Sequence, residues 1–183
     1  VERAQALLFP RVEFIGAHPM AGREVSGVEN ARADLFRGAN YIVTPTSANT
    51  EEAIACCEAL GRTLGARNIS RLTPKEHDEM IGFLSQLTHC IAVALMCAND
   101  QPGLEAFTGD SFRDLTRIAR INDKMWAELF LWNKQNLISE IDQFDSALQE
   151  MRAALVADDR DKLEQMFRLS TQRRAAFDKK LPE

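Results

Sequence analysis

The pattern of hydrophobic and polar positions changes character near Leu72. Before this residue, short apolar runs bounded by Gly, Pro or polar loops predict β-strands. The predicted strands cover residues 12–17, 40–44 and 66–70. A helix is expected over residues 50–64, with Thr50 as its N-cap and two acids in its first turn. The order of strand, helix and strand predicts an α/β sheet layer.

After Leu72 every predicted element is a helix. Thr73 and Glu76 form a capping-box pattern, with Pro74 at the first helical position. The predicted helices cover residues 74–99, 111–120 and 123–155, and a last one runs from a cap at Asp158 to about residue 179. The helix over 123–155 is amphipathic, because its apolar residues repeat at spacings of three and four. Residues 73–183 are therefore predicted to form an all-helical unit.

These two patterns predict two domains. About three strands and one helix form too thin a layer for an independent α/β domain. We therefore expect residues 1–72 to be the C-terminal part of a Rossmann-like nucleotide-binding domain whose first half lies upstream. Residues 73–183 are expected to form an all-α substrate-binding and dimerisation domain. The sequence contains neither GxGxxG nor GxxxxGK[ST], so cofactor-binding residues stay unassigned.

Composition and charge narrow the class of protein. The net charge of −5 disfavours nucleic-acid binding and means that an anionic substrate needs a local cluster of positive groups. The four cysteines form no CxxC pair, so we expect buried, reduced thiols and no metal site. The chain opens without a signal-peptide pattern, and its longest apolar run, residues 90–98, is far shorter than the ~20 residues of a membrane span. A soluble, cytoplasmic protein without membrane or nucleic-acid partners is expected.

Two histidines are candidates for chemistry. His18 follows the predicted strand over residues 12–17, and ligands of α/β sheets bind beyond the carboxyl ends of strands. An imidazole can also accept a proton near neutral pH. The alternative for His18 is a capping histidine in a turn. His89 lies in an apolar helix, where a histidine is either a ligand or a satisfied core residue. His77, in the first turn after the capping box, is expected to be structural.

Asp114 and Arg117 lie three residues apart and share one face of a short helix. On a surface they would form an ion pair of little energetic worth. In a cleft, Arg117 would bind a carboxylate in a bidentate manner and Asp114 would orient it. An aromatic and aliphatic stripe from Trp126 to Trp132 is expected to pack in a core or a dimer interface. The long apolar helices predict a homodimer, since a monomer would expose too much apolar surface.

Three stretches together resemble the prephenate dehydrogenase family. They are HPMAGREVSGVENARADLF with GANYIVTPT (residues 18–46), LTPKEHDEMIGFLSQLTH (72–89) and SFRDLTRIARINDKMWAELFLWN (111–133). They occur in the family's order, and the resemblance runs from about Val12 to the C-terminus. It is more specific than any single short motif.

The resemblance implies NAD-dependent oxidative decarboxylation of prephenate to 4-hydroxyphenylpyruvate in tyrosine biosynthesis. On this basis His18 is the general base that takes the proton of the ring hydroxyl. Arg117 binds a substrate carboxylate, with Asp114 as its orienting neighbour. His89 lines the same pocket, and Glu24 guards the entrance. Because the family's phosphate-binding turn is absent from these residues, the chain alone is expected to be inactive.

Several features leave alternatives open. The family's Ser-His-Leu-Pro-His stands here as Ser85-Gln86-Leu87-Thr88-His89, and Asp110 adds a negative charge before the substrate helix. Arogenate is an alternative substrate, because an extra acid could meet its ammonium group. NADP is an alternative to NAD, and some members of the family carry a C-terminal ACT domain. A non-catalytic helical dimerisation module and another hydroxy-acid dehydrogenase are the competing functions.

Overall fold

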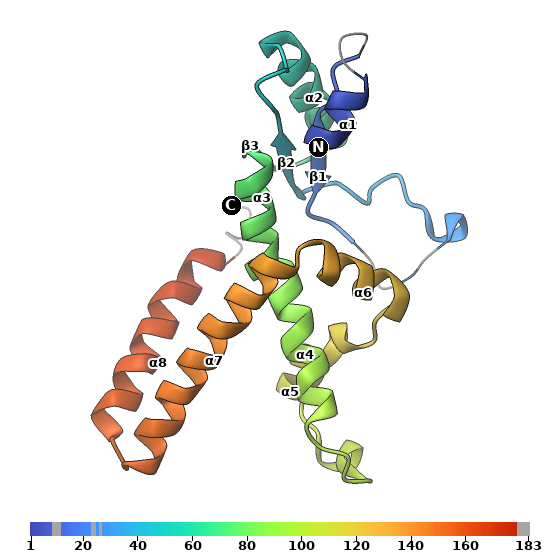
Figure 1. Cartoon of the computed structure of the whole chain (residues 1–183). Coiled ribbons are helices and arrows are strands. Elements are labelled where there is room, and N and C mark those ends of the chain that lie inside the picture. The colour runs from blue at the N-terminus through green and yellow to red at the C-terminus, as the bar shows by residue number, and fades with distance from the viewer. Residues whose placement is uncertain (9–11, 23–24, 26, 179–183) are drawn as a thin grey trace, which may run out of the picture. The chain divides into compact units, whose positions relative to one another are not determined.

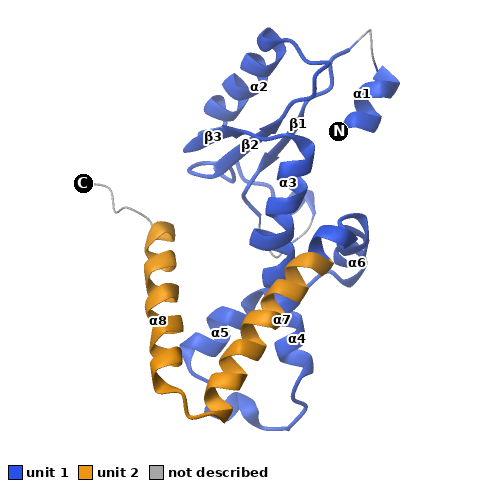
Figure 2. Cartoon of the chain, turned by 60° about the vertical axis from the view of Figure 1, so that its left-hand side comes forward, with its two compact units in different colours: residues 1–137 blue, residues 138–183 orange. Residues whose placement is uncertain are grey.

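The computed structural model describes residues 1–8, 12–22, 25 and 27–178 (Figure 1). Glu24 lies outside these residues, so its predicted role at the entrance has no structural description. The chain divides into two units, residues 1–137 and residues 138–183, which are coloured blue and orange in Figure 2. Each unit is described by itself. The predicted domain boundary at residue 72 stays a prediction.

A three-stranded sheet forms the first part of the larger unit. Its strands β1 (Gly16–Pro19), β2 (Asn40–Thr44) and β3 (Asn68–Arg71) lie in the order β1-β2-β3 (Figure 1). The central strand β2 is the most buried, and Val43 has no exposed surface. Helix α2 (Glu51–Thr63) connects the parallel strands β2 and β3. The prediction of an α/β layer is confirmed.

The first strand differs from its prediction. The expected strand covered residues 12–17, whereas β1 begins at Gly16 and runs antiparallel to β2. Phe14 cannot join the ladder, because its N–H donates to Oε1 of Gln5 (2.7 Å) and its carbonyl accepts from Nδ2 of Asn49 (3.1 Å). Gln5 belongs to helix α1 (Glu2–Leu8), which was not predicted. His18 therefore lies within β1, opposite Ile42, and does not follow the strand.

The caps of the next two helices agree with the sequence. Thr50 accepts a hydrogen bond from the N–H of Ala53, and the capping box joins Thr73 and Glu76 as predicted. Helix α3 (Pro74–Ile81) starts at this box, continues through a π-helical turn over Gly82–Leu87, and passes into α4 (Thr88–Cys97). The predicted continuous helix is thus present, with a π-helical turn that the sequence pattern did not indicate.

The predicted helix over residues 123–155 is divided in two. Helix α6 (Asp123–Trp132) ends at Asn133, and α7 (Lys134–Val156) begins directly after it. Asn133 has a non-helical backbone, and its Nδ2 donates to Oε1 of the buried Gln86 and to the carbonyl of Asp78, both at 2.8 Å. Because these bonds join α6 to the helix at 74–97, they hold α6 in the first unit.

Shorter helical segments complete the first unit. They are α5 (Asp110–Thr116) and 3₁₀ turns at Val28–Asn30, Leu104–Phe107 and Arg117–Ala119. The thiols were expected to be buried, but Cys56 and Cys97 are exposed. Cys57 and Cys90 are partly buried, and burial raises the pKa of Cys90.

The second unit contains most of α7 together with α8 (Arg160–Arg174) and a 3₁₀ turn at Ala175–Phe177. The cap of α8 is Asp159, not Asp158, since Asp159 accepts a hydrogen bond from the N–H of Lys162. Asp158 instead adopts a left-handed conformation with φ 52° in the turn. Within residues 73–178 the structure contains helices and no strand, in agreement with the predicted all-helical part.

Candidate functional site

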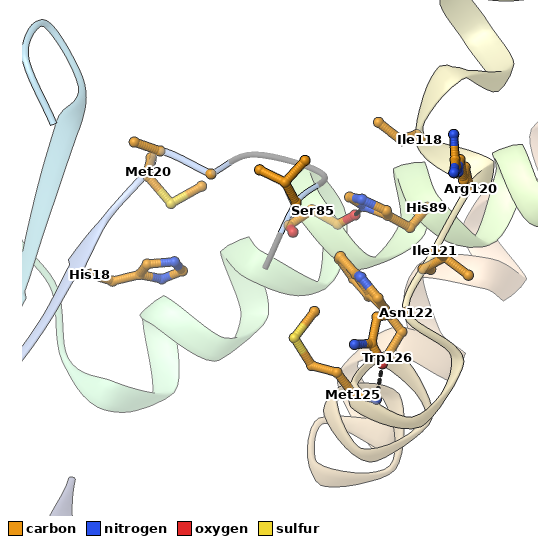
Figure 3. Close-up of a pocket in the computed structure, with 13 residues that line it drawn as sticks. His18, Met20, Ser85, His89, Ile118, Arg120, Ile121, Asn122, Met125 and Trp126 are labelled. Atoms are coloured by element: carbon orange, nitrogen blue, oxygen red, sulfur yellow. Dashed lines mark hydrogen bonds between the residues drawn. The ribbon is translucent and has the colours of Figure 1, made fainter. Parts of the chain in front are cut away.

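A cavity of about 520 Å³ lies in the first unit and is lined by three segments (Figure 3). One segment is β1 with the loop after it, which contributes His18 and Met20. The helix at 74–97 contributes His89 from the opposite side of the cavity. The third segment leads into α6 and contributes Arg120 and Trp126. The cavity therefore joins the α/β part and the helical part of the chain.

His18 is held by β1 with its ring beside the cavity (Figure 3). Its Nδ1 lies 2.9 Å from Nε2 of His77, in the first turn of α3. Burial lowers the pKa of His18, and the neighbouring His77 lowers it further. A lowered pKa keeps the imidazole neutral at pH 7, which is the form that accepts a proton.

His77 and Asp78 continue this contact away from the cavity. Nδ1 of His77 lies 2.8 Å from a carboxylate oxygen of Asp78. The sequence predicted a structural role for His77, and its contact with His18 was missed. The two histidines lie 59 residues apart, so no local pattern indicates that they meet.

His89 has a defined orientation. Its Nδ1 lies 2.8 Å from the carbonyl oxygen of Ser85, which can only accept, so this nitrogen carries the proton. Its ring stacks on Trp126, with ring centroids 3.8 Å apart and an interplanar angle of 28°. Phe130 contacts the same indole edge to face. Trp126 was expected only to pack, and the structure places it on the cavity beside His89.

The predicted carboxylate-binding pair is not part of the described lining of this cavity. Asp114 and Arg117 are both exposed, and neither is among the described residues that line the cavity. An ion pair on α5 joins Arg113 to Asp110 at 2.9 Å. Arg120 is the cationic side chain among the described lining residues, and the sequence did not single it out.

The chemical character of the cavity follows from these side chains. Among the described residues it combines the neutral imidazole of His18, the imidazole of His89 oriented by its hydrogen bond to Ser85, the guanidinium of Arg120, and apolar groups such as Met125. This set suits a small anionic molecule with a ring and a proton to remove. Among the described residues, no group of three or more His, Cys, Asp or Glu is placed to hold a metal ion.

The fold and this site define a class of protein, in which part of a nucleotide-binding α/β domain is followed by a helical domain. Two family models cover nearly the whole chain. One describes the nucleotide-binding domain of prephenate dehydrogenase and matches residues 1–70; the other describes its dimerization domain and matches residues 73–169. The chain therefore belongs to the prephenate dehydrogenase family.

Curated relatives and solved structures agree with this family. A prephenate dehydrogenase of Bacillus subtilis is 31% identical over 173 residues, which are 92% of this chain and 46% of the relative. A cyclohexadienyl dehydrogenase of Zymomonas mobilis is 29% identical over 174 residues, which are 92% of this chain and 59% of the relative. The chain thus spans about half the length of the curated relatives it matches.

Two solved structures share the fold over nearly all of this chain. The prephenate dehydrogenase of A. aeolicus, in complex with hydroxyphenyl propionate and NAD+, has a TM-score of 0.87 and 30% identity, covering 97% of this chain and 63% of that one. The arogenate dehydrogenase of Synechocystis has a TM-score of 0.83 and 25% identity, covering 97% and 65%. The likeness extends over both the α/β part and the helical part.

Proposed function

We propose that this chain is the substrate-binding and dimer-forming part of an enzyme that converts prephenate and NAD⁺ to 4-hydroxyphenylpyruvate, carbon dioxide and NADH. One observation carries the proposal. His18 and His89, taken from the sequence as separate candidates 71 residues apart (89 − 18), line the same cavity. We also propose that the chain alone does not catalyse this reaction and that the protein is cytoplasmic.

His18 is the residue that we propose as the general base. NAD⁺ supplies the acceptor for the hydride that leaves the hydroxyl-bearing ring carbon. His18 takes the hydroxyl proton as the hydride leaves and the carbon–oxygen bond becomes a carbonyl. The bond to the ring carboxylate then breaks and carbon dioxide departs. Its electron pair makes the ring aromatic, and the carbonyl oxygen takes the proton back from His18 to form the phenol hydroxyl. The lowered pKa of His18 supports this role, because the imidazole is already in its basic form at neutral pH.

The remaining residues bind and orient the substrate. Trp126 supplies a flat apolar surface, and His89 stacks on it with its Nδ1–H donated to the carbonyl of Ser85, which leaves Nε2 of His89 for the substrate. Prephenate carries two carboxylates, and we assign one to Arg117, oriented by Asp114, and one to Arg120 on the cavity. Glu24 retains its proposed role at the entrance. The assignment of Arg117 and Asp114 rests on their match to the family's motif.

A second cavity suits one part of the cofactor. It measures about 530 Å³ and is lined by Thr46 and Ser47 after β2, Thr73 before α3, and Gln5 of α1, among others. Dinucleotides bind beyond the carboxyl ends of parallel strands, which is where β2 ends. The described lining contains hydroxyl groups, the amide of Gln5 and the carboxylate of Glu2, but no basic side chain. It therefore suits ribose or carboxamide groups of NAD, and not the pyrophosphate.

Arogenate is a second candidate substrate, because a relative of similar fold is an arogenate dehydrogenase. Asp110 was considered as a partner for the ammonium group of arogenate. Its side chain is 93% exposed and paired with Arg113, so it offers little support for that role. Prephenate remains the substrate that we propose first.

A homodimer is proposed from the dimerization-domain match over residues 73–169 and from the apolar surface of the helices there. Leu131 and Trp132 are 68% and 89% exposed in the single chain. By length and composition, the helical run Pro74–Cys97 also qualifies as a membrane span, with 28% of its apolar window buried. A helix that packs against a second copy has the same composition, so we assign this surface to the dimer.

Titration calorimetry with a longer version of the chain, which includes the upstream half of the nucleotide-binding domain, tests the proposal. We expect prephenate to bind more tightly than arogenate, and His18→Asn to reduce turnover far more than binding. NAD-dependent turnover should appear only in the longer version. Equal turnover by His18→Asn would refute the role of His18, and a dimer with no affinity for either compound would support a non-catalytic module.

A further inference from the structure

We propose that Asp78 and His77 act as positioning residues that fix the tautomer of His18, so that its Nε2 is the unprotonated atom available to the substrate. The inference rests on the proposed function of His18 as a base. It concerns three residues, which we call the Asp78–His77–His18 chain. Neither His77 nor Asp78 lines the described cavity, so both act through His18.

Two hydrogen bonds link the three residues, from the exposed carboxylate to the ring at the cavity. An ionised carboxylate only accepts, so the 2.8 Å contact with Asp78 places a proton on Nδ1 of His77. A neutral imidazole carries one proton, which leaves Nε2 of His77 as an acceptor. The 2.9 Å contact with His18 then requires Nδ1 of His18 to donate. Neutral His18 therefore has its lone pair on Nε2.

The backbone holds both ends of this chain in place. His18 is fixed by its pairing with Ile42 in the sheet. His77 follows the capping box of α3, where Thr73 and Glu76 satisfy each other's main-chain groups. The side chain of His77 is 18% exposed, whereas that of Asp78 is 59% exposed. The middle residue is thus shielded, and the carboxylate at the end meets solvent.

This order of hydrogen bonds helps a base in two ways. It selects the productive tautomer before the substrate arrives, so no reorganisation is needed. When His18 becomes an imidazolium, its Nδ1–H still donates to His77, and the Asp78 carboxylate stabilises the added charge through that ring. The other described titratable side chains that line the cavity with His18 are His89 and Arg120, and neither contributes to this chain of hydrogen bonds.

The tautomer can be measured without turnover. Long-range ¹H–¹⁵N NMR spectra of the 183-residue chain, recorded above the pKa of His18, distinguish a proton on Nδ1 from one on Nε2. We expect the proton on Nδ1. Asp78→Asn should move it to Nε2, because an amide can donate to His77 and reverse both hydrogen bonds. Glu79→Gln is the matched control, since Glu79 is an exposed neighbour paired with Lys75, and it should leave the tautomer unchanged.

Kinetics with the longer version provide the second readout. Asp78→Asn is expected to lower kcat about 10–100-fold with little change in KM, while Glu79→Gln keeps the parent values. His77→Gln should retain more activity than His77→Phe, because its amide oxygen can accept from His18. Circular dichroism melts establish that each variant is folded.

The outcomes separate this inference from the proposed function. A proton on Nε2 of His18 in the parent chain, or an unchanged tautomer in Asp78→Asn, overturns the inference whatever the activity. If the tautomer behaves as expected but His18→Asn retains full turnover, the positioning is correct and the role of His18 as base is wrong.

Discussion

Two arginines, three residues apart, are candidates for binding a substrate carboxylate, and each is supported by a different observation. Arg117 matches the family's motif, and Arg120 lines the cavity that His18 and His89 share. Replacing each by Ala in the longer version of the chain measures what each contributes. Arg113→Ala is the matched control, because Arg113 is paired with Asp110 on the exposed face of α5.

The expected size of the effect follows from the position of Arg120. A guanidinium and a carboxylate about 4 Å apart interact by about 4 kcal/mol at an effective dielectric constant of ~20. Arg120 is exposed in the single chain, so solvent screening reduces the net value to about 0.5–1 kcal/mol. This corresponds to an increase of roughly 2–5-fold in the dissociation constant of prephenate.

Equilibrium titration with prephenate is the direct assay, since KM equals a dissociation constant only when chemistry is slow. We expect Arg120→Ala to weaken binding by the stated factor and to leave kcat nearly unchanged. Arg120→Lys should recover part of the affinity, because the charge is kept but the bidentate geometry is lost. If Arg120→Ala binds prephenate like the parent while Arg117→Ala does not, the described cavity is not where a substrate carboxylate lies.

Three further predictions concern stability and pH. The pKa of His18 is lower in the folded chain than in the unfolded chain, so below about pH 6.5 the unfolded chain binds more protons. The free energy of unfolding should therefore decrease as the pH falls below about 6.5. Urea melts of His18→Asn should show a smaller loss of this free energy over the same pH range. Gly61→Ala should reduce the free energy of unfolding by about 1–2 kcal/mol, because the new Cβ would lie 2.6 Å from the ring of buried Tyr41, and overpacking outweighs the ~1 kcal/mol gain in helix propensity. A more stable variant would contradict this account. Gln86→Leu should cost about 1–3 kcal/mol in the same melts, since Asn133 and the carbonyl of Leu129 each lose one hydrogen-bond partner; an unchanged melt would show that this contact does not hold α6.

Much of the fold was determined locally and could be predicted from the sequence. Thr50 and Thr73 cap helices as expected, because capping depends on residues within one turn. Strand β2 matches its prediction over residues 40–44, since an apolar run that ends at Pro45 has few alternatives. The change from an α/β part to an all-helical part also agrees with the change in hydrophobic pattern near residue 72.

Other features were decided by contacts between distant residues. Phe14 stays outside the sheet because amide side chains of Gln5 and Asn49 take its main-chain groups. The break before α7 depends on Asn133 reaching a helix more than forty positions earlier, at Gln86 (|i−j| = 47). Hydrophobic periodicity records which face of an element is buried, but it does not record which polar group the element will meet.

The site, too, could be predicted from the sequence only in part. His18 and His89 could be singled out from their residue type and surroundings, and the family's motif singled out Arg117. Arg120 and Trp126 gained their places on the cavity, and His77 its contact with His18, only through the packing of segments that lie far apart in the sequence. The sequence determines which chemical groups are present. Which nitrogen of a histidine carries the proton, and which groups it contacts, depends on distances of a few ångströms between residues far apart in the chain, and these distances cannot be predicted from spacing along the sequence.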